Sequence, residues 1–158
     1  MVKTYSAAEM IITIDGTQVT GFSDGDLVTV SFDDAKFAKY VSVDGPTSRS
    51  HNVSNAGMFK FSLSQTSASN GIFSNALNRD DARVGKGLLK VYIADPLSGG
   101  TFFKSNDCWV KGLPEAAFGK EIGAFEWEVD APNIKFSIQE LAPSGLLGEL
   151  LNVVGDVL

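Results

Sequence analysis

Apolar and polar residues alternate along several short stretches of the chain, a pattern typical of β-strands that bury one face. The alternation is clear in residues 27–32 (LVTVSF), 58–64 (MFKFSLS) and 124–130 (AFEWEVD). In each stretch every second residue is Val, Phe, Leu or Trp, and most residues between them are polar. We therefore expect three half-buried strands, each with an apolar and a polar face.

Two hairpins are expected from turn residues. Asp15 and Gly16 stand between the β-prone runs Met10–Ile14 and Gln18–Phe22, and an Asp-Gly pair in that position is a strong signal for a tight hairpin. The run Leu88–Ala94 is almost continuously apolar, so we expect a strand covered on both faces. A turn with Pro and Gly then leads into another strand-like run, which predicts the second hairpin.

One segment changes its apolar period to that of a helix. Four apolar residues within positions 72–77 (IFSNAL) have helical spacing, and Ser69 before them is of a type that often caps helix N-termini. We expect one short helix over Ser69–Asn78.

A long polar stretch, DGPTSRSHNVSNAG (residues 44–57), separates two strand-like runs. Adjacent Asp33 and Asp34 predict a bend, and a strand over Phe37–Val43 follows. We expect that strand to pair with residues 58–64, in a long hairpin whose exposed tip is residues 44–57. Ordered loops longer than about 12 residues are uncommon unless functional, so this tip is a candidate assembly arm. A plain solvated loop is the alternative.

Length and composition suit one domain over residues 1–158, since 44% of the residues are hydrophobic and can build one core. The net charge is −6 and no cluster of Lys and Arg is evident, so we do not expect binding to nucleic-acid phosphates. No apolar run reaches membrane-spanning length and no secretory leader is recognisable, so we expect no membrane association.

Candidate catalytic and metal-binding groups are few. His51 is the only histidine and Cys108 the only cysteine, whereas a catalytic triad needs a placed base and a closed zinc site needs four ligands. Glu126 and Glu128 lie two apart on one expected strand, where carboxylates more often form a solvated surface than a glycosidase pair. The sequence therefore predicts no catalytic residue, no metal site and no cofactor.

The run Glu9–Leu77 resembles the tail tube proteins of contractile-tailed bacteriophages. The likeness lies in the order of a hairpin, the projecting loop DGPTSRSHNVSNAG and the strand-to-helix passage FSLSQTSASN. It implies a mainly β fold, an antiparallel β-sandwich or barrel of the tail tube type with one short flanking helix and a long projecting hairpin loop. It also implies a structural virion protein whose hexameric rings stack into the inner tube of the tail, around a channel for DNA delivery.

The same resemblance implies partners and location. Partners would be other copies of the chain, a tail sheath protein outside, and a tape measure protein and transiting DNA inside without specific binding. A baseplate and a tail terminator would hold the two ends. The location would be the virion tail, assembled in the cytoplasm of the bacterial host.

Two sets of candidate site residues follow. The candidate ring-stacking residues of the loop are Asp44, Pro46, Arg49, His51, Asn52 and Asn55. The candidate channel-lining residues are Thr29, Ser31, Lys60, Ser62, Ser64, Glu126, Glu128 and Asp130. Small polar or acidic linings would repel DNA rather than bind it, and an ordinary solvated outer face is the equal alternative. The apolar tail at residues 145–158 is expected to form a weak helix or to dock on a neighbour.

Two other functions remain open at this point. An Hcp-like tube of a type VI secretion system shares the ring architecture. A carbohydrate-binding β-sandwich is the alternative from another class, but such modules usually expose aromatic platforms, and here most aromatic residues alternate inward.

Overall fold

The chain folds into ten strands, one α-helix and two short 3-10 helices within the part that the structure describes. The structure is a computed structural model that describes residues 2–138, so the expected tail at residues 145–158 lies outside the described part. The strands are β1 (Ile11–Ile14), β2 (Thr17–Gln18), β3 (Val28–Phe32), β4 (Phe37–Val41), β5 (Thr47–His51), β6 (Gly57–Ser64), β7 (Leu89–Asp95), β8 (Thr101–Val110), β9 (Ala124–Ala131) and β10 (Lys135–Ser137). The helices are α1 (Asn70–Ala82), η1 (Ala7–Glu9) and η2 (Pro96–Ser98).

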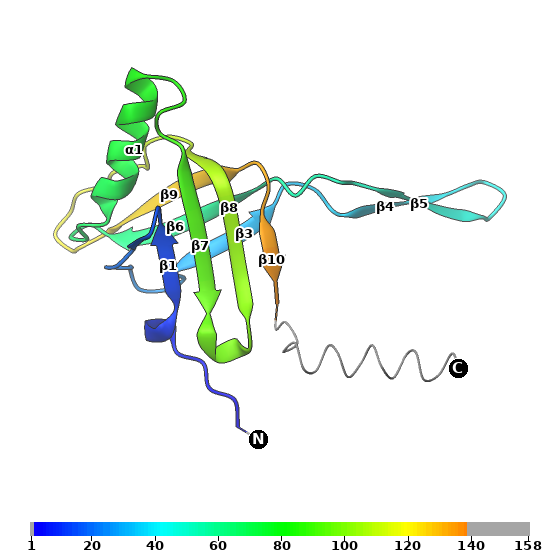
Figure 1. The fold of residues 1–158 in the computed structure, drawn as a ribbon, viewed down its shortest axis with the longest axis horizontal. Coiled ribbons are helices and arrows are strands. Elements are labelled where there is room, and N and C mark those ends of the chain that lie inside the picture. Colours follow the sequence, from blue (N-terminus) through cyan, green and yellow to red (C-terminus); the bar gives the residue numbers. More distant parts are fainter. Residues whose placement is uncertain (1, 139–158) are drawn as a thin grey trace.

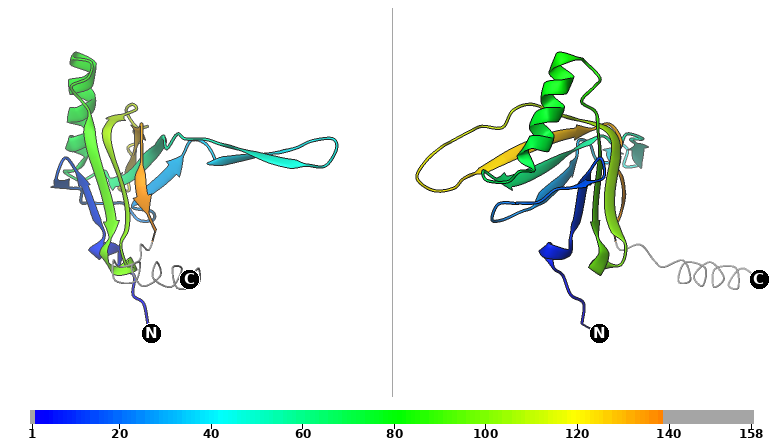
Figure 2. Two further views of the ribbon diagram at one scale, coloured as in Figure 1. Left: turned by 45° about the vertical axis from the view of Figure 1, so that its right-hand side comes forward. Right: turned by 60° about the vertical axis from the view of Figure 1, so that its left-hand side comes forward.

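Eight of the strands form one antiparallel sheet in the order β2-β1-β7-β8-β9-β6-β3, with β10 paired to β8. Strand β8 belongs to both halves of this sheet, because its longer first part pairs with β7 while Trp109 and Val110 pair with β9. The half with β9, β6 and β3 crosses the half with β1 and β7, and α1 lies at one end (Figures 1 and 2). The two halves enclose a single core.

The core is built on the apolar face of β6. Phe59, Phe61 and Leu63 are each 0% exposed. Helix α1 contributes Phe73, whose ring lies 5.0 Å from that of Phe61 and 5.5 Å from the stacked ring of Trp127. The other half of the sheet adds the buried residues Ile12, Ile14, Val91 and Ile93. Alternation along each strand thus produces one shared interior.

Asn70 fixes the start of α1 against the sheet. Its side-chain amide donates to the Ser64 carbonyl at 2.9 Å and the Ser67 carbonyl at 3.0 Å. Its Oδ1 accepts a hydrogen bond from Nε1 of Trp127 at 2.9 Å. The indole can therefore be buried with its polar group satisfied.

Several sequence expectations are confirmed, and two are wrong. The Asp15–Gly16 hairpin is present as β1 and β2, and the expected helix is present but runs on to Ala82. The strand β7 is not covered on both faces, because Lys90 and Tyr92 are exposed between buried neighbours. No layer covers the outer side of this half within residues 2–138, so β7 alternates after all.

The projecting hairpin is also paired differently from the prediction. Strand β4 pairs with β5, a strand inside the stretch that was expected to be a loop, and not with β6. Strand β6 pairs instead with β3 and β9. The reason is physical: residues 47–51 are polar and gain no burial, but their backbone groups are satisfied by β4. We call residues 33–56, from the Asp33–Asp34 bend to the start of β6, the arm.

The aromatic cluster around Phe73 gives a stability prediction. Phe73→Ala should lower the free energy of unfolding by about 3–5 kcal/mol, because it opens a cavity between Phe61 and Trp127. Urea denaturation followed by Trp fluorescence measures this change. Val84→Ala, at a side chain that is 95% exposed, is the matched control and should shift the value by less than about 0.5 kcal/mol. Equal losses of unfolding free energy in the two variants would contradict the placement of Phe73 in the core.

Candidate assembly surfaces

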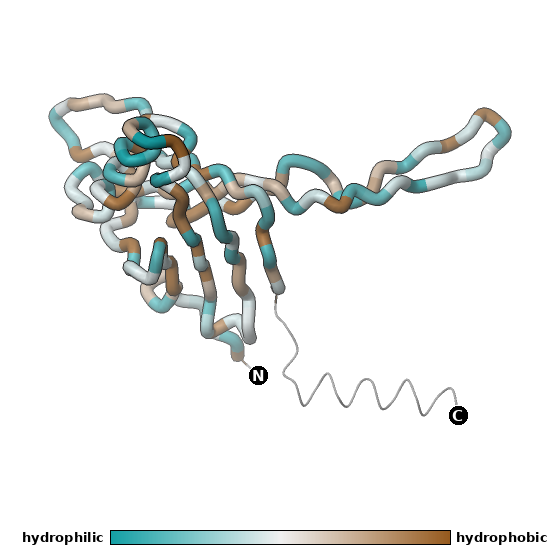
Figure 3. The backbone as a smooth tube through the Cα atoms, turned by 45° about the horizontal axis from the view of Figure 1, so that its top comes forward, coloured by the Kyte–Doolittle hydropathy of each residue, from teal (hydrophilic) through white to brown (hydrophobic). Residues whose placement is uncertain are grey.

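The arm is a two-stranded ribbon that projects far from the body (Figure 1). Its strands pair Phe37 with His51 and Lys39 with Arg49, and residues 41 and 47 form the last pair. All ten residues of β4 and β5 are exposed. Figure 3 shows that apolar positions recur along the arm, including near its tip. A ribbon with so little burial has no core of its own, and its side chains are accessible to another molecule.

One face of the ribbon is aromatic and cationic. The ring of His51 stacks on that of Phe37 with a centroid distance of 5.0 Å, and Cζ of Arg49 lies 4.3 Å from the Phe37 centroid. Lys39 lies directly opposite Arg49 on the same face. Cation–π contact holds the guanidinium against the ring, so its charge is presented in a fixed place.

The tip of the arm is a tight turn over residues 42–46. Ser42 donates to the Pro46 carbonyl from its backbone nitrogen and from its hydroxyl, both at 3.0 Å. Gly45 has φ of 102°, a conformation that side chains rarely adopt. Asp44 and Pro46, two of the predicted stacking residues, therefore lie at the tip, next to the fully exposed Val43.

The remaining predicted stacking residues occupy two other places. Arg49 and His51 lie on β5, whereas Asn52 and Asn55 lie at the base of the arm, which we call the arm root (residues 33–36 and 52–56). There the backbone nitrogen of Asn52 donates to the Lys36 carbonyl at 2.8 Å, and the Asn55 carbonyl accepts from the backbone of Ile134 at 2.9 Å. The six residues are thus spread from tip to root and do not form one cluster.

All eight predicted channel-lining residues lie on one surface. Residues directly opposite each other in antiparallel strands share a face, and the register of β3, β6 and β9 aligns Thr29 with Lys60 and Lys60 with Glu128. A parallel row contains Ser31 and Asp130, and Ser62 lies opposite Glu126. We call this surface the polar face; its residues are Thr29, Ser31, Lys60, Ser62, Ser64, Glu126, Glu128 and Asp130.

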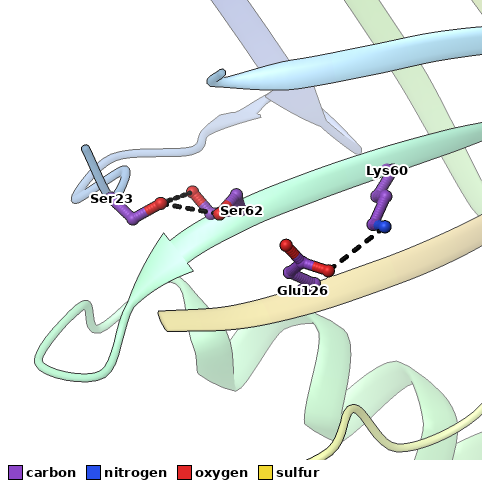
Figure 4. Close-up of polar contacts among 4 residues, drawn as sticks. All are labelled: Ser23, Lys60, Ser62 and Glu126. Carbon is purple, nitrogen blue, oxygen red and sulfur yellow. Dashed lines mark hydrogen bonds and ion pairs between the residues drawn. The ribbon is translucent and has the colours of Figure 1, made fainter. Parts of the chain in front are cut away.

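Contacts within the polar face are sparse. Nζ of Lys60 lies 3.1 Å from Oε2 of Glu126, and Oγ of Ser23 lies 2.6 Å from Oγ of Ser62 (Figure 4). The ion pair is solvent-exposed at both ends and adds little stability. The polar face keeps an excess of carboxylates over cations among its eight residues.

Sequence reasoning missed three residues of this surface. Met58 lies between Ser31 and Asp130, and Trp109 of β8 lies opposite Asp130. Lys111, two residues after Trp109, lies beside Glu128, because its backbone nitrogen donates to the Glu128 carbonyl at 2.9 Å. The run of Cys, Trp and Val at positions 108–110 is apolar throughout, so its alternation could not be seen.

The sheet that carries the polar face ends in open edges. Among the strands that the structure describes, β3 pairs only with β6. Hydrogen bonds join Leu27 to Ser62 and Asp33 to Ala56, so the alternation of an antiparallel ladder turns the Val30 N–H away from β6, together with those of its neighbours at 28 and 32. Open edges of this kind are templates for another strand.

The opposite border of this sheet is also incomplete. β9 pairs with β8 only at Val129 and Asp130, and the segment after Lys111 leaves the sheet. A groove of about 700 Å³ lies between that segment and the first half of β9. Both borders of the sheet are therefore accessible.

The described residues bring no catalytic constellation together. His51 is on the arm, while Cys108 is buried in the body, where burial raises the pKa of its thiol. Within residues 2–138 no three His, Cys, Asp or Glu side chains are close enough to hold a metal ion. None of the helices described there has the length and apolarity to cross a membrane.

No protein-family model matches the chain. It is 28% identical to "Structural protein ORF10" of Pseudomonas phage KPP10 over 120 residues, which are 75% of this chain and 68% of that protein.

Solved structures share its fold, among them the following three. A chain of the anti-feeding prophage cap (AFP tube terminating cap) matches with a TM-score of 0.57 and 15% identity, over 87% of this chain and 93% of its own. A chain of the PVC sheath-tube complex of an extracellular contractile injection system matches with a TM-score of 0.55 and 11% identity, over 85% of this chain and 92% of its own. A chain of the PVC sheath/tube terminator of such a system matches with a TM-score of 0.57 and 10% identity, over 85% of this chain and 96% of its own.

These likenesses define the class. The chain has the fold of the tube-type proteins of contractile injection systems, and it is a homologue of a phage structural protein. The resemblance stated from Glu9–Leu77 is thereby confirmed, as is a mainly β antiparallel fold with one helix.

A substitution on each side of β6 tests the division into a polar face and a core. Lys60→Ala should change the free energy of unfolding by less than about 1 kcal/mol, because it removes only an exposed ion pair. The neighbouring Phe61→Ala should cost about 3–5 kcal/mol. Thermal or urea unfolding compares them, and a large loss in Lys60→Ala would mean that the polar face is part of what holds the fold together.

Proposed function

We propose that the chain is a structural protein of a phage tail, and that its hexameric rings stack into the inner tube of a contractile tail. The observation that carries this proposal is the sheet β3-β6-β9, whose apolar face is covered by the core but whose borders are open. The homology of the chain to a phage structural protein and its tube-type fold support the same role.

Ring closure follows from the open borders. Because an edge strand exposes unpaired N–H and C=O groups, pairing between copies removes a liability and adds hydrogen bonds. The two borders are different surfaces, so their contact is head-to-tail, and such contacts close into a ring when the rotation between copies suits. In the closed ring, the polar faces of all copies form one continuous lining.

The lining suits a channel for DNA. Glu126, Glu128 and Asp130 give it negative charge near small hydroxyl side chains, and like charge keeps DNA from adhering during passage. A tape measure protein occupies the channel before the DNA, a sheath protein surrounds the tube, and a baseplate and a terminator close its ends. The protein thus functions in the virion tail after assembly in the host cytoplasm, and needs no cofactor, enzymatic activity or membrane.

Two of the solved structures are tube terminators, and this favours one second candidate. A terminator forms a ring but offers only one surface to a neighbouring ring. Purified protein that gives single rings and no tubes would favour the terminator, whereas tubes favour the repeating subunit. An Hcp-like secretion tube would also stack, and the phage relative argues for the tail.

Blocking the open edge tests ring formation. Val30→Pro removes an N–H on the side of β3 away from β6, and proline is tolerated on edge strands. We expect a folded chain that fails to form rings in analytical ultracentrifugation and negative-stain microscopy. Val30→Ala trims the same side chain but keeps the N–H, so it should still form rings. Rings from Val30→Pro would show that β3 is not the closing edge.

Shortening the arm tests stacking. Replacing residues 38–50 with a short Gly-containing turn between Phe37 and His51 should leave the body folded, because the removed residues are exposed. We expect rings of normal diameter and no tubes in electron micrographs. Tubes of normal length from this variant would contradict the proposal that the arm stacks the rings.

A further inference from the structure

Beyond the arm root, the ribbon of the arm carries positive charge on an acidic protein. Residues 37–51 hold two basic residues and one acidic residue, whereas the chain as a whole has a net charge of −6. Lys39 and Arg49 are exposed on one face of the ribbon. Within residues 2–138 the only ion pair joins Lys60 to Glu126, so neither arm cation has an acidic partner among those residues. Their complement is to be sought on another molecule.

The arm root has the opposite charge. Asp33 and Asp34 are exposed at the bend between β3 and β4, and in the described part of the chain they form no ion pair. The one cation of the root is engaged elsewhere, since Nζ of Lys36 donates to the Ser54 carbonyl at 3.1 Å and lies 3.5 Å from that of Asn52. Two adjacent carboxylates are therefore available to a partner.

Exposed apolar groups accompany both charged surfaces. Beside the acidic pair, the ring of Phe136 lies 5.2 Å from that of Phe32 and 6.1 Å from that of Phe103. Phe32 is 37% exposed and Phe136 is 46% exposed. The distal arm offers Val41 and Val43, which are 56% and 103% exposed. Each surface thus joins charge to apolar area, which is the composition of a protein–protein contact.

The arm cannot reach its own root. The eleven residues from Asp33 to Val43 span about 33 Å when extended, and five paired positions hold the ribbon straight away from the body (Figures 1 and 2). The acceptor of a given arm is therefore on a different molecule, and the complementary surface seen on this chain belongs to every copy.

We propose that the receptor for each arm is the arm root of another copy. Lys39 and Arg49 pair with Asp33 and Asp34 of that copy, and the apolar tip packs on the ring cluster of Phe32, Phe103 and Phe136. Donor and receptor surfaces differ, so the contact is head-to-tail, and between stacked rings it repeats along the axis of the tube. The inference rests on the proposed stacking role of the arm and assigns the surface that receives it.

Charge reversal with rescue tests this pairing. The root variant Asp33→Lys/Asp34→Lys and the arm variant Lys39→Glu/Arg49→Glu should each form rings but lose tubes, because like charges then face each other. The variant with all four reversals should recover tubes, and so should a mixture of the two double variants. Negative-stain microscopy measures tube length, and sedimentation measures ring formation.

Asp24→Lys/Asp26→Lys is the matched control, since it makes the same change of charge at an exposed acidic pair in another loop. It should leave tubes intact. Tubes of wild-type length from both double variants, or the absence of tubes from the fourfold variant, would contradict the assignment of the arm root as the receptor. Either result would leave the proposed tube function unaffected. Wild-type protein that remains monomeric would instead overturn the proposed function itself.

Discussion

The structure depends on the one-sided burial of β6. Its inward side chains are fully buried. Phe61 packs on Phe73 of the helix and lies opposite Trp127 of the paired strand β9, whose indole stacks on the same Phe73 ring. Because side chains alternate in a strand, the residues between them are forced onto the opposite face. That face can remain polar at no cost to the core. A slip of one residue would exchange the two faces, so burial of Phe59, Phe61 and Leu63 also sets the register of the polar face.

The same strand fixes where the arm leaves the body. Gly57 begins β6 and is buried, and a Cβ placed there would collide with the Ser31 carbonyl and with Ile134. The backbone of the arm root therefore passes closely between β3 and the segment before β10. The backbone hydrogen bond from Ile134 to Asn55 ties the root down from the other side. An exposed ribbon thus starts from a rigid base, which gives its direction without any packing of its own.

The sequence allowed prediction of those features that depend on local pattern. The Asp-Gly hairpin, the helix after Ser69 and the two faces of β3, β6 and β9 all follow from alternation or turn chemistry. The pairing of the strands could not be predicted in the same way. The polar strand β5 lacks an apolar alternation to identify it, so the sequence predicts that β4 pairs with β6 instead of β5. The contribution of Trp109 was hidden for the opposite reason, since its neighbours are also apolar. Convergence of the eight predicted residues on one face needed the register, which is a long-range property.

The distribution of charge links the two candidate surfaces. The polar face combines three carboxylates with Lys60 as the one cation among its eight residues, and the arm places Lys39 and Arg49 on an exposed ribbon. In the proposed tube, arm cations that faced the channel would attract the DNA phosphates that the carboxylates would repel, and transit would be slowed. Each proposed function therefore requires that the two surfaces be separated in space. The projection of the arm away from the sheet provides that separation, and neutralisation of its cations by acidic groups of another copy would complete it.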